Sequence, residues 1–297
     1  MNNRKEVAVV LVTYNRKNLL LEAIDGVLSQ TTKVDHIFIV DNNSTDGTRT
    51  MLHEKFGNNI NFTLIFLQEN TGSAGGFHYG VKKAYEEGYQ WVWFLDDDVS
   101  PESSCLDVMF SYKNISKCIH PNKKFLDGSQ FMWEALFSPS MGSINFMNNV
   151  SFQNGKDFTF VNIGCFEGML INRDIIAKIG FPDRRFFIGG DDVIYGFESS
   201  LHTNVIFLKN AFLKKLIPVS EKQKPTALYY SIRNQFLLIK HLKELGLFRP
   251  ARFYPFLLMN IIFSMTRHVF TTRSSKTPWY VVRAVFDGLR GKFYKMK

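Results

Sequence analysis

The amino-acid sequence predicts an α/β fold with a mostly parallel sheet, helices on both of its faces, and further helices at the C-terminal end. Short apolar runs without polar alternation recur through the first third of the chain, as in strands buried on both faces of a parallel sheet. Stretches with apolar residues at helical spacing separate these runs. Each run ends in Asp, Asn, Ser, Thr or Gly, so ligand-binding loops should gather at one edge of the sheet.

In the first half of the chain, strands and helices are expected to alternate. The expected strands are Val7–Val12, His36–Val40, Phe62–Leu67 and Trp91–Leu95. The expected helices are Asn18–Leu28, Thr48–Lys55, and one that follows the glycine-rich loop Glu69–Gly76 and runs through Gly88. Neither a GxGxxG dinucleotide fingerprint nor a GxxxxGK[ST] phosphate loop occurs, which disfavours dehydrogenases and P-loop proteins.

The second half has a weaker pattern. Residues 113–157 are expected to contain helix, loop and short antiparallel strands. The elements expected after them are a strand at Phe158–Ile171, a short helix at Arg173–Ile179, a strand at Asn204–Leu208 and a long helix at Ala227–Leu245.

Composition narrows the class of protein. The chain has 297 residues, 45% hydrophobic and 21% charged, which is typical of a folded protein. Its three cysteines lack metal-ligand spacing and predict a reduced protein without a disulfide framework. A formal charge of +9 suits nucleic acid, an anionic membrane or a phosphorylated ligand. No nucleic-acid-binding motif stands out, so we expect no nucleic-acid partner.

The C-terminal third combines apolar and basic residues. Phe253–Met265 is strongly apolar, is interrupted by Pro255 and Asn260, and is flanked by Arg and Lys. Such a segment fits a helix lying on an anionic membrane surface, and the concentration of positive charge and aromatic residues favours this over the alternative, in which these helices only pack on the rest of the protein. No run reaches the ~18 apolar residues of a spanning helix, and Val7–Val12 is too short for a signal-peptide core. We expect a soluble or peripheral protein.

Three adjacent acids, Asp96, Asp97 and Asp98, follow the buried Trp91–Leu95 segment. Like charges side by side repel, and a divalent cation bound by carboxylate oxygens would compensate them. Asp96 and Asp98 can point to the same side of an extended backbone, and Asp97 to the other. The alternative is an acidic turn that ends the strand.

Five motifs in a fixed order resemble the family 2 glycosyltransferases of GT-A fold. They are VTYNR, VDNNSTDGT, ENTGSAGGFHYG, LDDDV and GGDDVIYGFE, and the resemblance covers roughly residues 5–240. Within the family, NTGSAGGFHYG leading into WVWFLDDD, together with YYSIRN and DGLRGK, is similar to the bacterial galactofuranosyl- and rhamnosyltransferase branch. The complete DDD and the GGDD pair favour galactofuranosyl transfer.

The resemblance implies a GT-A catalytic domain at residues 1–225 and a helical, membrane-associated region at residues 226–297. Within the domain, residues 1–112 would form the nucleotide-sugar half and residues 113–225 the acceptor half. The implied enzyme is an inverting, metal-dependent hexosyltransferase acting on a glycan acceptor, expected to be lipid-linked, at the cytoplasmic face of a bacterial membrane. UDP-galactofuranose is the first expected donor and dTDP-rhamnose the second. The alternative from another class is a nucleotide-sugar-binding module without catalysis.

The resemblance also implies roles for residues of the donor site. Uridine-pocket residues would be Thr13, Asn15 and Asp41, and donor-loop residues Asn70, Gly72, Gly75 and Gly76. Asp96 and Asp98 would bind Mn²⁺ or Mg²⁺, and Asp97 would bind hydroxyl groups of the donor sugar. The alternatives are a turn-forming role for Asp41 and purely structural turns for the glycines.

On the acceptor side, Asp192 would be the general base and Asp191 would orient the acceptor, unless either acid caps the following helix. Arg233, with Tyr229 or Tyr230, would reach the phosphates or the acceptor, or else lie on a helix surface. Galactofuranosyltransferases of this kind have a histidine metal ligand about where Lys215 stands here. Lys215 would then contact the donor diphosphate, or the metal would be held by two side chains.

Overall fold

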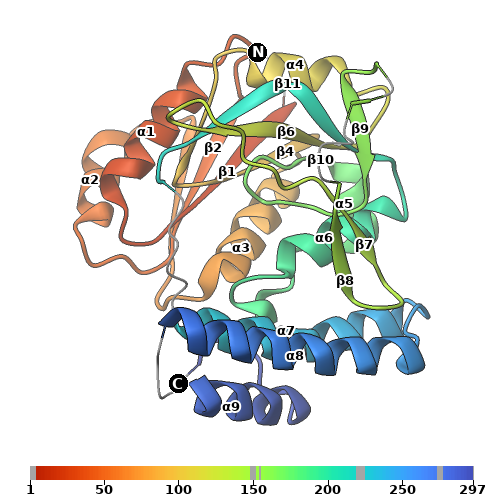
Figure 1. The fold of residues 1–297 in the computed structure, drawn as a ribbon. Helices are drawn as coiled ribbons and strands as arrows, with labels where there is room; N and C mark the ends of the chain where they lie inside the picture. The colour runs from red at the N-terminus through yellow and green to blue at the C-terminus, as the bar shows by residue number, and fades with distance from the viewer. Residues whose placement is uncertain (1–4, 148–151, 154, 219–224, 273–276, 297) are drawn as a thin grey trace.

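The computed structural model describes residues 5–147, 152–153, 155–218, 225–272 and 277–296. One large sheet runs through the molecule in the order β3-β2-β1-β4-β10-β6-β11-β5, with β9 paired to β11 (Figure 1). Its first half is parallel and consists of β1 (Val7–Thr13), β2 (His36–Asp41), β3 (Phe62–Phe66) and β4 (Trp91–Asp96). The mostly parallel α/β sheet predicted from the sequence is therefore confirmed.

Alternation along each central strand supplies a separate hydrophobic core on each face of the sheet. In β1, Val9 lies opposite Ile37 and Trp93 in the neighbouring strands, and all three are buried in one core. Helices α1 (Lys17–Leu28), α2 (Thr48–Phe56) and α4 (Cys105–Ser111) cover that face. The other face is covered by α3 (Gly72–Glu86), α5 (Arg173–Ile179) and α6 (Asp191–Ser200).

The second half of the sheet is mixed in direction. Its strands are β5 (Val99–Pro101), β6 (Cys118–Phe125), β9 (Phe158–Val161), β10 (Leu170–Asn172) and β11 (Val205–Lys215), and β7 (Ala135–Ser138) and β8 (Ser143–Phe146) form a separate hairpin. The single strand predicted at Phe158–Ile171 is wrong. Two strands occur there, and residues 162–169 connect them.

The predicted start of α3 is also wrong, because the helix already begins at Gly72 rather than after Gly76. A Cβ atom on Gly76 would lie 2.4 Å from a methyl carbon of Val12, and one on Gly75 would lie 2.3 Å from the hydroxyl oxygen of Thr71. These two glycines therefore let the helix pack closely on β1 and on its own first residues. Gly75 and Gly76 therefore lie in a helix and not in the predicted loop.

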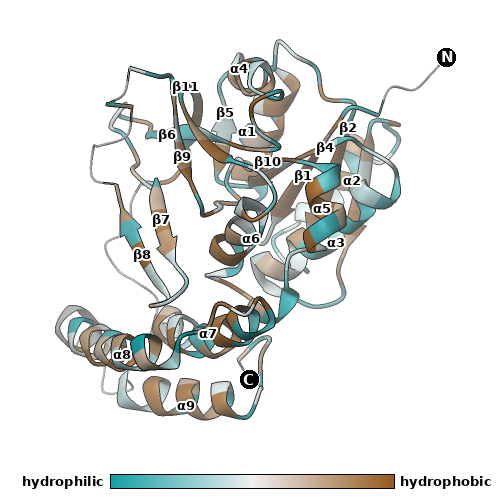
Figure 2. Cartoon of the chain, turned by 90° about the vertical axis from the view of Figure 1, so that its right-hand side faces the viewer, coloured by the Kyte–Doolittle hydropathy of each residue, from teal (hydrophilic) through white to brown (hydrophobic). Residues whose placement is uncertain are grey.

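Three C-terminal helices form a layer below the large sheet: α7 (Pro225–Glu244), α8 (Pro250–Thr272) and α9 (Thr277–Leu289) (Figures 1 and 2). Pro255 lies inside α8 without ending it. Among the described helices, none combines the length and hydropathy that crossing a membrane requires. All three cysteines are free thiols.

Candidate active site

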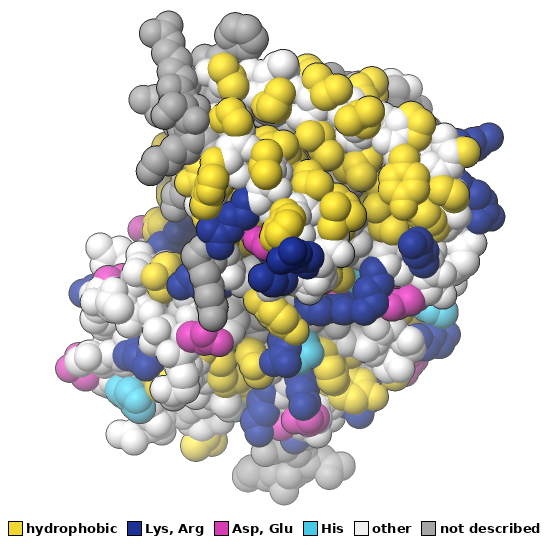
Figure 3. Space-filling model, turned by 90° about the horizontal axis from the view of Figure 1, so that it is seen from below, with side chains coloured by type: hydrophobic (Ala, Val, Ile, Leu, Met, Phe, Trp, Pro, Cys, Tyr) yellow, Lys and Arg dark blue, Asp and Glu magenta, His cyan; other side chains and the backbone are white. Residues whose placement is uncertain are grey.

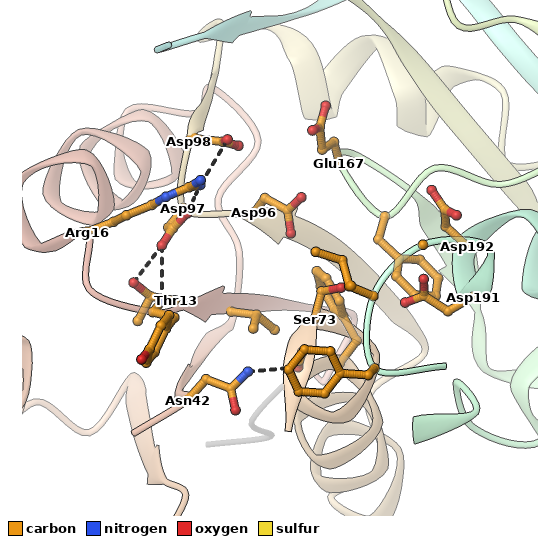
Figure 4. A pocket seen from close by; sticks show the side chains of 18 of the residues that line it. Thr13, Arg16, Asn42, Ser73, Asp96, Asp97, Asp98, Glu167, Asp191 and Asp192 are labelled. Carbon is orange, nitrogen blue, oxygen red and sulfur yellow. Dashed lines mark hydrogen bonds and ion pairs between the residues drawn. The ribbon is translucent and has the colours of Figure 1, made fainter. Parts of the chain in front are cut away.

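A pocket of about 490 Å³ opens at the carboxyl ends of β1 and β4 (Figure 4). Its wall is completed by the first residues of α3, by the segment between β9 and β10, and by the residues that lead into α6. The carboxyl edge of parallel strands is where open α/β sheets bind ligands. The polar strand ends noted in the sequence converge here.

Three carboxylates meet in this pocket. Asp96 is the last residue of β4, Asp98 follows that strand, and Glu167 comes from the segment between β9 and β10. One carboxylate oxygen of each lies within 4.8 Å of the others. Oδ1 of Asp98 is buried without a hydrogen-bond partner. Burial, together with the charges of Glu167, Asp98 and Asp97, raises the pKa of Asp96 well above its ordinary value. Such a group of hard oxygens fits a divalent cation.

Glu167 is held between two lysines. Lys123 Nζ lies 3.1 Å from one of its carboxylate oxygens, and Lys215 Nζ lies 2.7 Å from the other. Burial alone would raise the pKa of Glu167, but the two ammonium groups outweigh it and lower the pKa to about 2. Glu167 is therefore ionised. The sequence-based interpretation missed it because it lies inside an apolar run that predicted one continuous strand.

Asp97 points to the opposite side of the strand end from Asp96. Its carboxylate accepts a hydrogen bond from the Thr13 hydroxyl at 2.7 Å, and Arg16 Nη1 lies 3.0 Å from both Asp97 and Asp98. Arg16, from the VTYNR motif, therefore compensates part of the acidic charge. The sequence interpretation named Thr13 and Asp97 but not Arg16.

Asp191 and Asp192 occupy the first turn of α6, across the pocket from Asp97 and Asp98 (Figure 4). Gly190, at a φ of +87°, is the N-cap residue of α6, so neither acid occupies the N-cap position. Asp192 nevertheless accepts a hydrogen bond from the Val193 N–H of the first turn at 2.8 Å. Burial and the charge of Asp192 raise the pKa of Asp191 to about 8. Burial and, to a smaller degree, Glu167 raise the pKa of Asp192 to about 6.

Residues 8–180 match the family model described as glycosyl transferase family 2. The chain belongs to this family. Over 205 residues it is 29% identical to the galactofuranosyltransferase GlfT1 of Mycolicibacterium smegmatis, a match that covers 65% of each chain. The match to GlfT1 of Mycobacterium tuberculosis H37Rv is 27% identical and covers 64% of this chain and 62% of that protein. This family 2 member therefore spans less than two thirds of these relatives.

Solved structures of other glycosyltransferases share the GT-A fold with this family 2 chain. The crystal structure of Staphylococcus aureus TarS residues 1–349 superposes with a TM-score of 0.60 at 16% identity, over 96% of this chain and 80% of that one. At 14% identity, the crystal structure of GalNAc-T7 with UDP, GalNAc and Mn²⁺ gives a TM-score of 0.63, over 90% of this chain and 58% of that one. These likenesses establish the fold.

Several residues expected in the donor site of this family 2 glycosyltransferase do line the pocket. They are Thr13, Asn70, Gly72, Asp96, Asp97 and Asp98. Gly72 has a φ of +76°, and a Cβ atom there would lie 1.8 Å from the carbonyl oxygen of Phe187. Asn42, which the sequence interpretation missed, donates a hydrogen bond to the Gly72 carbonyl at 2.7 Å and so fixes the start of α3.

Other expected donor residues lie outside the pocket lining. Asp41 is fully buried and pairs with Arg49 at 2.6 Å, while it also accepts a hydrogen bond from Ser44 N–H at 3.2 Å. Asn15, at a φ of +54°, accepts a hydrogen bond from Thr45 N–H. Gly75 and Gly76 are buried in α3. The last two therefore have packing roles, as described above.

The structure does not bring Arg233 into the pocket, so the expected acceptor contact has no geometric support. Arg233 is fully buried in α7. It donates hydrogen bonds to the carbonyl oxygens of Arg185, Phe186 and Tyr294. The adjacent Asn234 donates to the carbonyl oxygens of Phe186, Ile188 and Gly189. The pair therefore holds the segment that leads into Asp191 and Asp192.

Proposed function

We propose that this chain is an inverting glycosyltransferase that transfers galactofuranose from UDP-galactofuranose to a glycan acceptor. The observation that carries the proposal is one pocket. Asp96, Asp98 and Glu167 converge in it, and Asp192, at the start of α6, lines the same pocket. The GlfT1 relatives favour galactofuranose over rhamnose. A single displacement at a sugar carbon needs a donor site and a separate carboxylate that acts as the base.

The proposed cation site consists of Asp96, Asp98 and Glu167, with Mn²⁺ or Mg²⁺ as the ion. Their oxygens lie within 4.8 Å of one another, and Asp98 contributes a buried oxygen that has no hydrogen-bond partner. A bound cation would supply electrostatic stabilisation of the departing diphosphate. Glu167 thus takes the place of the histidine ligand that is missing near Lys215. Lys215, expected from the sequence to contact the donor diphosphate, lies outside the pocket lining and is left to orient Glu167, at 2.7 Å.

Asp192 is the proposed general base. With a pKa raised to about 6, its carboxylate is ionised at neutral pH yet basic enough to accept a proton from an acceptor hydroxyl. Asp191, with a pKa raised to about 8, is protonated at neutral pH and can donate a hydrogen bond to the acceptor. One base on one side of the sugar implies direct displacement with inversion of configuration.

The proposed acceptor is lipid-linked, and the proposed location is the cytoplasmic face of a membrane. We assign catalysis to residues 1–225 and the membrane-facing role to residues 226–297. Phe187 of the pocket wall stacks on Tyr230 of α7 with their ring centroids 5.0 Å apart. The pocket therefore adjoins the helical layer, which supports an acceptor delivered from that side.

The decisive experiment incubates the protein with Mn²⁺, a lipid-linked glycan acceptor and a panel of nucleotide sugars. We expect transfer from UDP-galactofuranose, and transfer only from dTDP-rhamnose would replace the donor assignment. Asp192→Asn should lower the transfer rate by about 10²–10⁴-fold and leave UDP affinity within about twofold. Asp174→Asn, at an exposed site on α5, is the matched control. Loss of UDP binding in Asp192→Asn would move Asp192 into the donor site.

Measuring donor turnover also distinguishes the proposed enzyme from a nucleotide-sugar-binding module. A module without catalysis would bind UDP-sugars and release no UDP from any donor, with any acceptor. A nucleic-acid-binding protein would instead show salt-sensitive affinity for DNA or RNA that needs no divalent metal. Either result would overturn the proposal.

A further inference from the structure

The net positive charge of the chain lies in its C-terminal region. Residues 245–297 contain ten Lys and Arg side chains and one acid, Asp287, a difference of +9. The whole chain contains 36 Lys and Arg and 27 Asp and Glu, also a difference of +9. Residues 1–244 therefore carry no net charge. Asp287 is 13% exposed and accepts a hydrogen bond from the Tyr229 hydroxyl, so even this acid is turned towards α7.

The same region exposes large apolar side chains along one side of each helix. In α8, Leu258, Ile262 and Phe263 are 60%, 51% and 63% exposed, and the last two lie four and five positions after Leu258. Phe253 and Leu257, on the other side of α8, are buried in the main core. Spacing of this kind places the exposed side chains in one stripe.

A second stripe lies on α9. Trp279, Val282, Phe286 and Leu289 are 50%, 69%, 47% and 72% exposed, at spacings of three and four residues. Their opposite side packs on α7: a Cβ atom on Gly288 would lie 2.3 Å from the Phe236 ring. Seen from below, the two stripes fall within one broad apolar area bordered by Lys and Arg (Figure 3).

We propose that the apolar face of α8 and α9 docks on an anionic lipid surface. The apolar side chains would enter the headgroup region, and exposed cations such as Arg252, Arg290 and Lys292 would contact lipid phosphates. The inference rests on the proposed function in one respect, because a lipid-linked acceptor requires the enzyme to work at such a surface. Docking in this orientation leaves α7 between the lipid and the pocket wall at Phe187.

Charge complementarity selects this occupant over two others. If a second copy of the chain covered the face, two regions that each carry +9 would be brought together. A nucleic acid would satisfy the cations but leave the apolar stripes exposed to water. An anionic lipid surface accommodates both features at once, because it offers negative headgroups above a hydrocarbon interior.

The test measures flotation of the full-length chain with vesicles of phosphatidylcholine that contain phosphatidylglycerol, and with vesicles of phosphatidylcholine alone. We expect clear binding to the anionic vesicles that weakens as salt is raised. The variant Val282→Asp/Leu289→Asp should lose about tenfold or more of this binding. The matched control is Ile60→Asp/Leu126→Asp, which alters side chains that are 89% and 68% exposed elsewhere and should bind like the wild type.

The outcomes distinguish this inference from the proposed function. UDP binding and the hydrolysis of the donor sugar nucleotide should be the same in Val282→Asp/Leu289→Asp as in the wild type, which also shows that the variant is folded. Equal vesicle binding by the wild type and this variant would overturn the docking face while leaving the enzyme assignment intact. Dimers that appear in light scattering and vanish in this variant, without vesicle binding, would assign the face to a second copy.

Discussion

At the residue scale, Glu167 connects the acidic end of the pocket to two lysines. Its carboxylate lies beside Asp96 and Asp98 and is held in place by Lys123 and Lys215. Lys123 is itself fully buried, with its ammonium group also 2.7 Å from Cys165 Sγ. A carboxylate fixed by two cations is ionised and immobile, and these are the properties of a preorganised ligand.

The first prediction concerns metal affinity. Glu167→Gln should weaken Mn²⁺ binding by about tenfold or more, because a neutral amide replaces a charged oxygen ligand. Titration calorimetry of the full-length protein with Mn²⁺ measures the effect. Glu86→Gln, at an exposed position in α3, is the control and should not change it. Unchanged affinity in Glu167→Gln would mean that Asp96 and Asp98 hold the ion without a third side chain.

The second prediction concerns Asn234, which holds the segment in front of the proposed base. Asn234→Asp removes the donor of three hydrogen bonds to carbonyl oxygens. We expect a free energy of unfolding lower by about 1–3 kcal/mol, and a transfer kcat that falls more than UDP affinity does. Asn145→Asp, on an exposed stretch of β8, is the matched control. A fall in stability with kcat unchanged would show that Asn234 supports the fold alone.

The residues that could be predicted from the sequence are those whose signal is local. Asp96 and Asp98 directly follow an apolar strand, and Asp191 and Asp192 follow two glycines. Arg233 was misjudged, because its hydrogen-bond partner Tyr294 lies 61 positions further along the chain. No local sequence pattern predicts a contact between residues so far apart in the chain.

At the element scale, α3 shows how glycine can be mistaken for a loop signal. Gly80 faces β1 and β2, and a Cβ atom there would lie 2.4 Å from a Val10 methyl carbon and 3.0 Å from a Val40 methyl carbon. The glycines of ENTGSAGGFHYG therefore set the distance between helix and sheet. The predicted β–α alternation was confirmed, whereas the start of this helix was wrong.

The third prediction tests that packing. Gly80→Ala should lower the free energy of unfolding by about 1–3 kcal/mol through overpacking. This effect should outweigh the higher helix propensity of alanine. Urea unfolding followed by circular dichroism measures the change. Val10→Ala removes the clashing methyl groups. The loss of unfolding free energy caused by Val10→Ala should therefore be at least about 0.5 kcal/mol smaller in the Gly80→Ala protein than in the wild type. Additive effects of the two substitutions would show that the helix shifts freely.

The fourth prediction concerns His241, which joins α7 to α6 and to the turn before it. Its ring nitrogens lie 2.8 Å from Glu198 and 3.0 Å from Asp183. Burial alone lowers the pKa of His241, but these two acids outweigh it and raise the pKa to about 9. The folded state therefore favours the protonated ring. This stabilisation is fully present below the unfolded pKa of about 6.5 and is lost as pH rises through about 9.

Between about pH 6 and about pH 10, the free energy of unfolding should accordingly fall by on the order of 2 kcal/mol through His241. Urea unfolding at a series of pH values measures it. His241→Gln provides the control, because it retains every other titrating group and should show a flatter profile. A profile as steep as that of the wild type would exclude His241 as the source.

At the scale of the whole molecule, predictability follows the range of the contacts. The parallel half of the sheet consists of neighbouring β–α units, and apart from the start of α3 the strands and helices there lie close to their predicted bounds. The other half pairs β6 with β10 and β11, which come from distant parts of the chain. Residues 113–157 therefore show little local pattern. For the same reason the sequence does not predict the site role of Glu167, which lies between β9 and β10.

The fifth prediction is that residues 1–225, the proposed catalytic part, and the C-terminal helices unfold together. The two are joined by the Phe187–Tyr230 stack, by Arg233 and by a hydrogen bond from Tyr294 N–H to the Arg185 carbonyl at 3.0 Å. Arg233 and Tyr230 are buried, and the contacts span the boundary proposed at residue 225, so separating the layers would expose unpaired polar groups and apolar surface. A single cooperative transition is therefore expected.

In Trp279→Phe, tryptophan fluorescence comes only from Trp91, Trp93 and Trp133 in the catalytic part, while the far-ultraviolet circular dichroism includes all helices. Urea titration should give the same midpoint for both signals, since loss of α7 would remove the support of the segment before Asp191. An earlier loss of ellipticity, with fluorescence still native, would contradict this and define residues 226–297 as a separate folding unit. Their contacts with the segment before Asp191 would then be too weak to hold the proposed base, Asp192, in place.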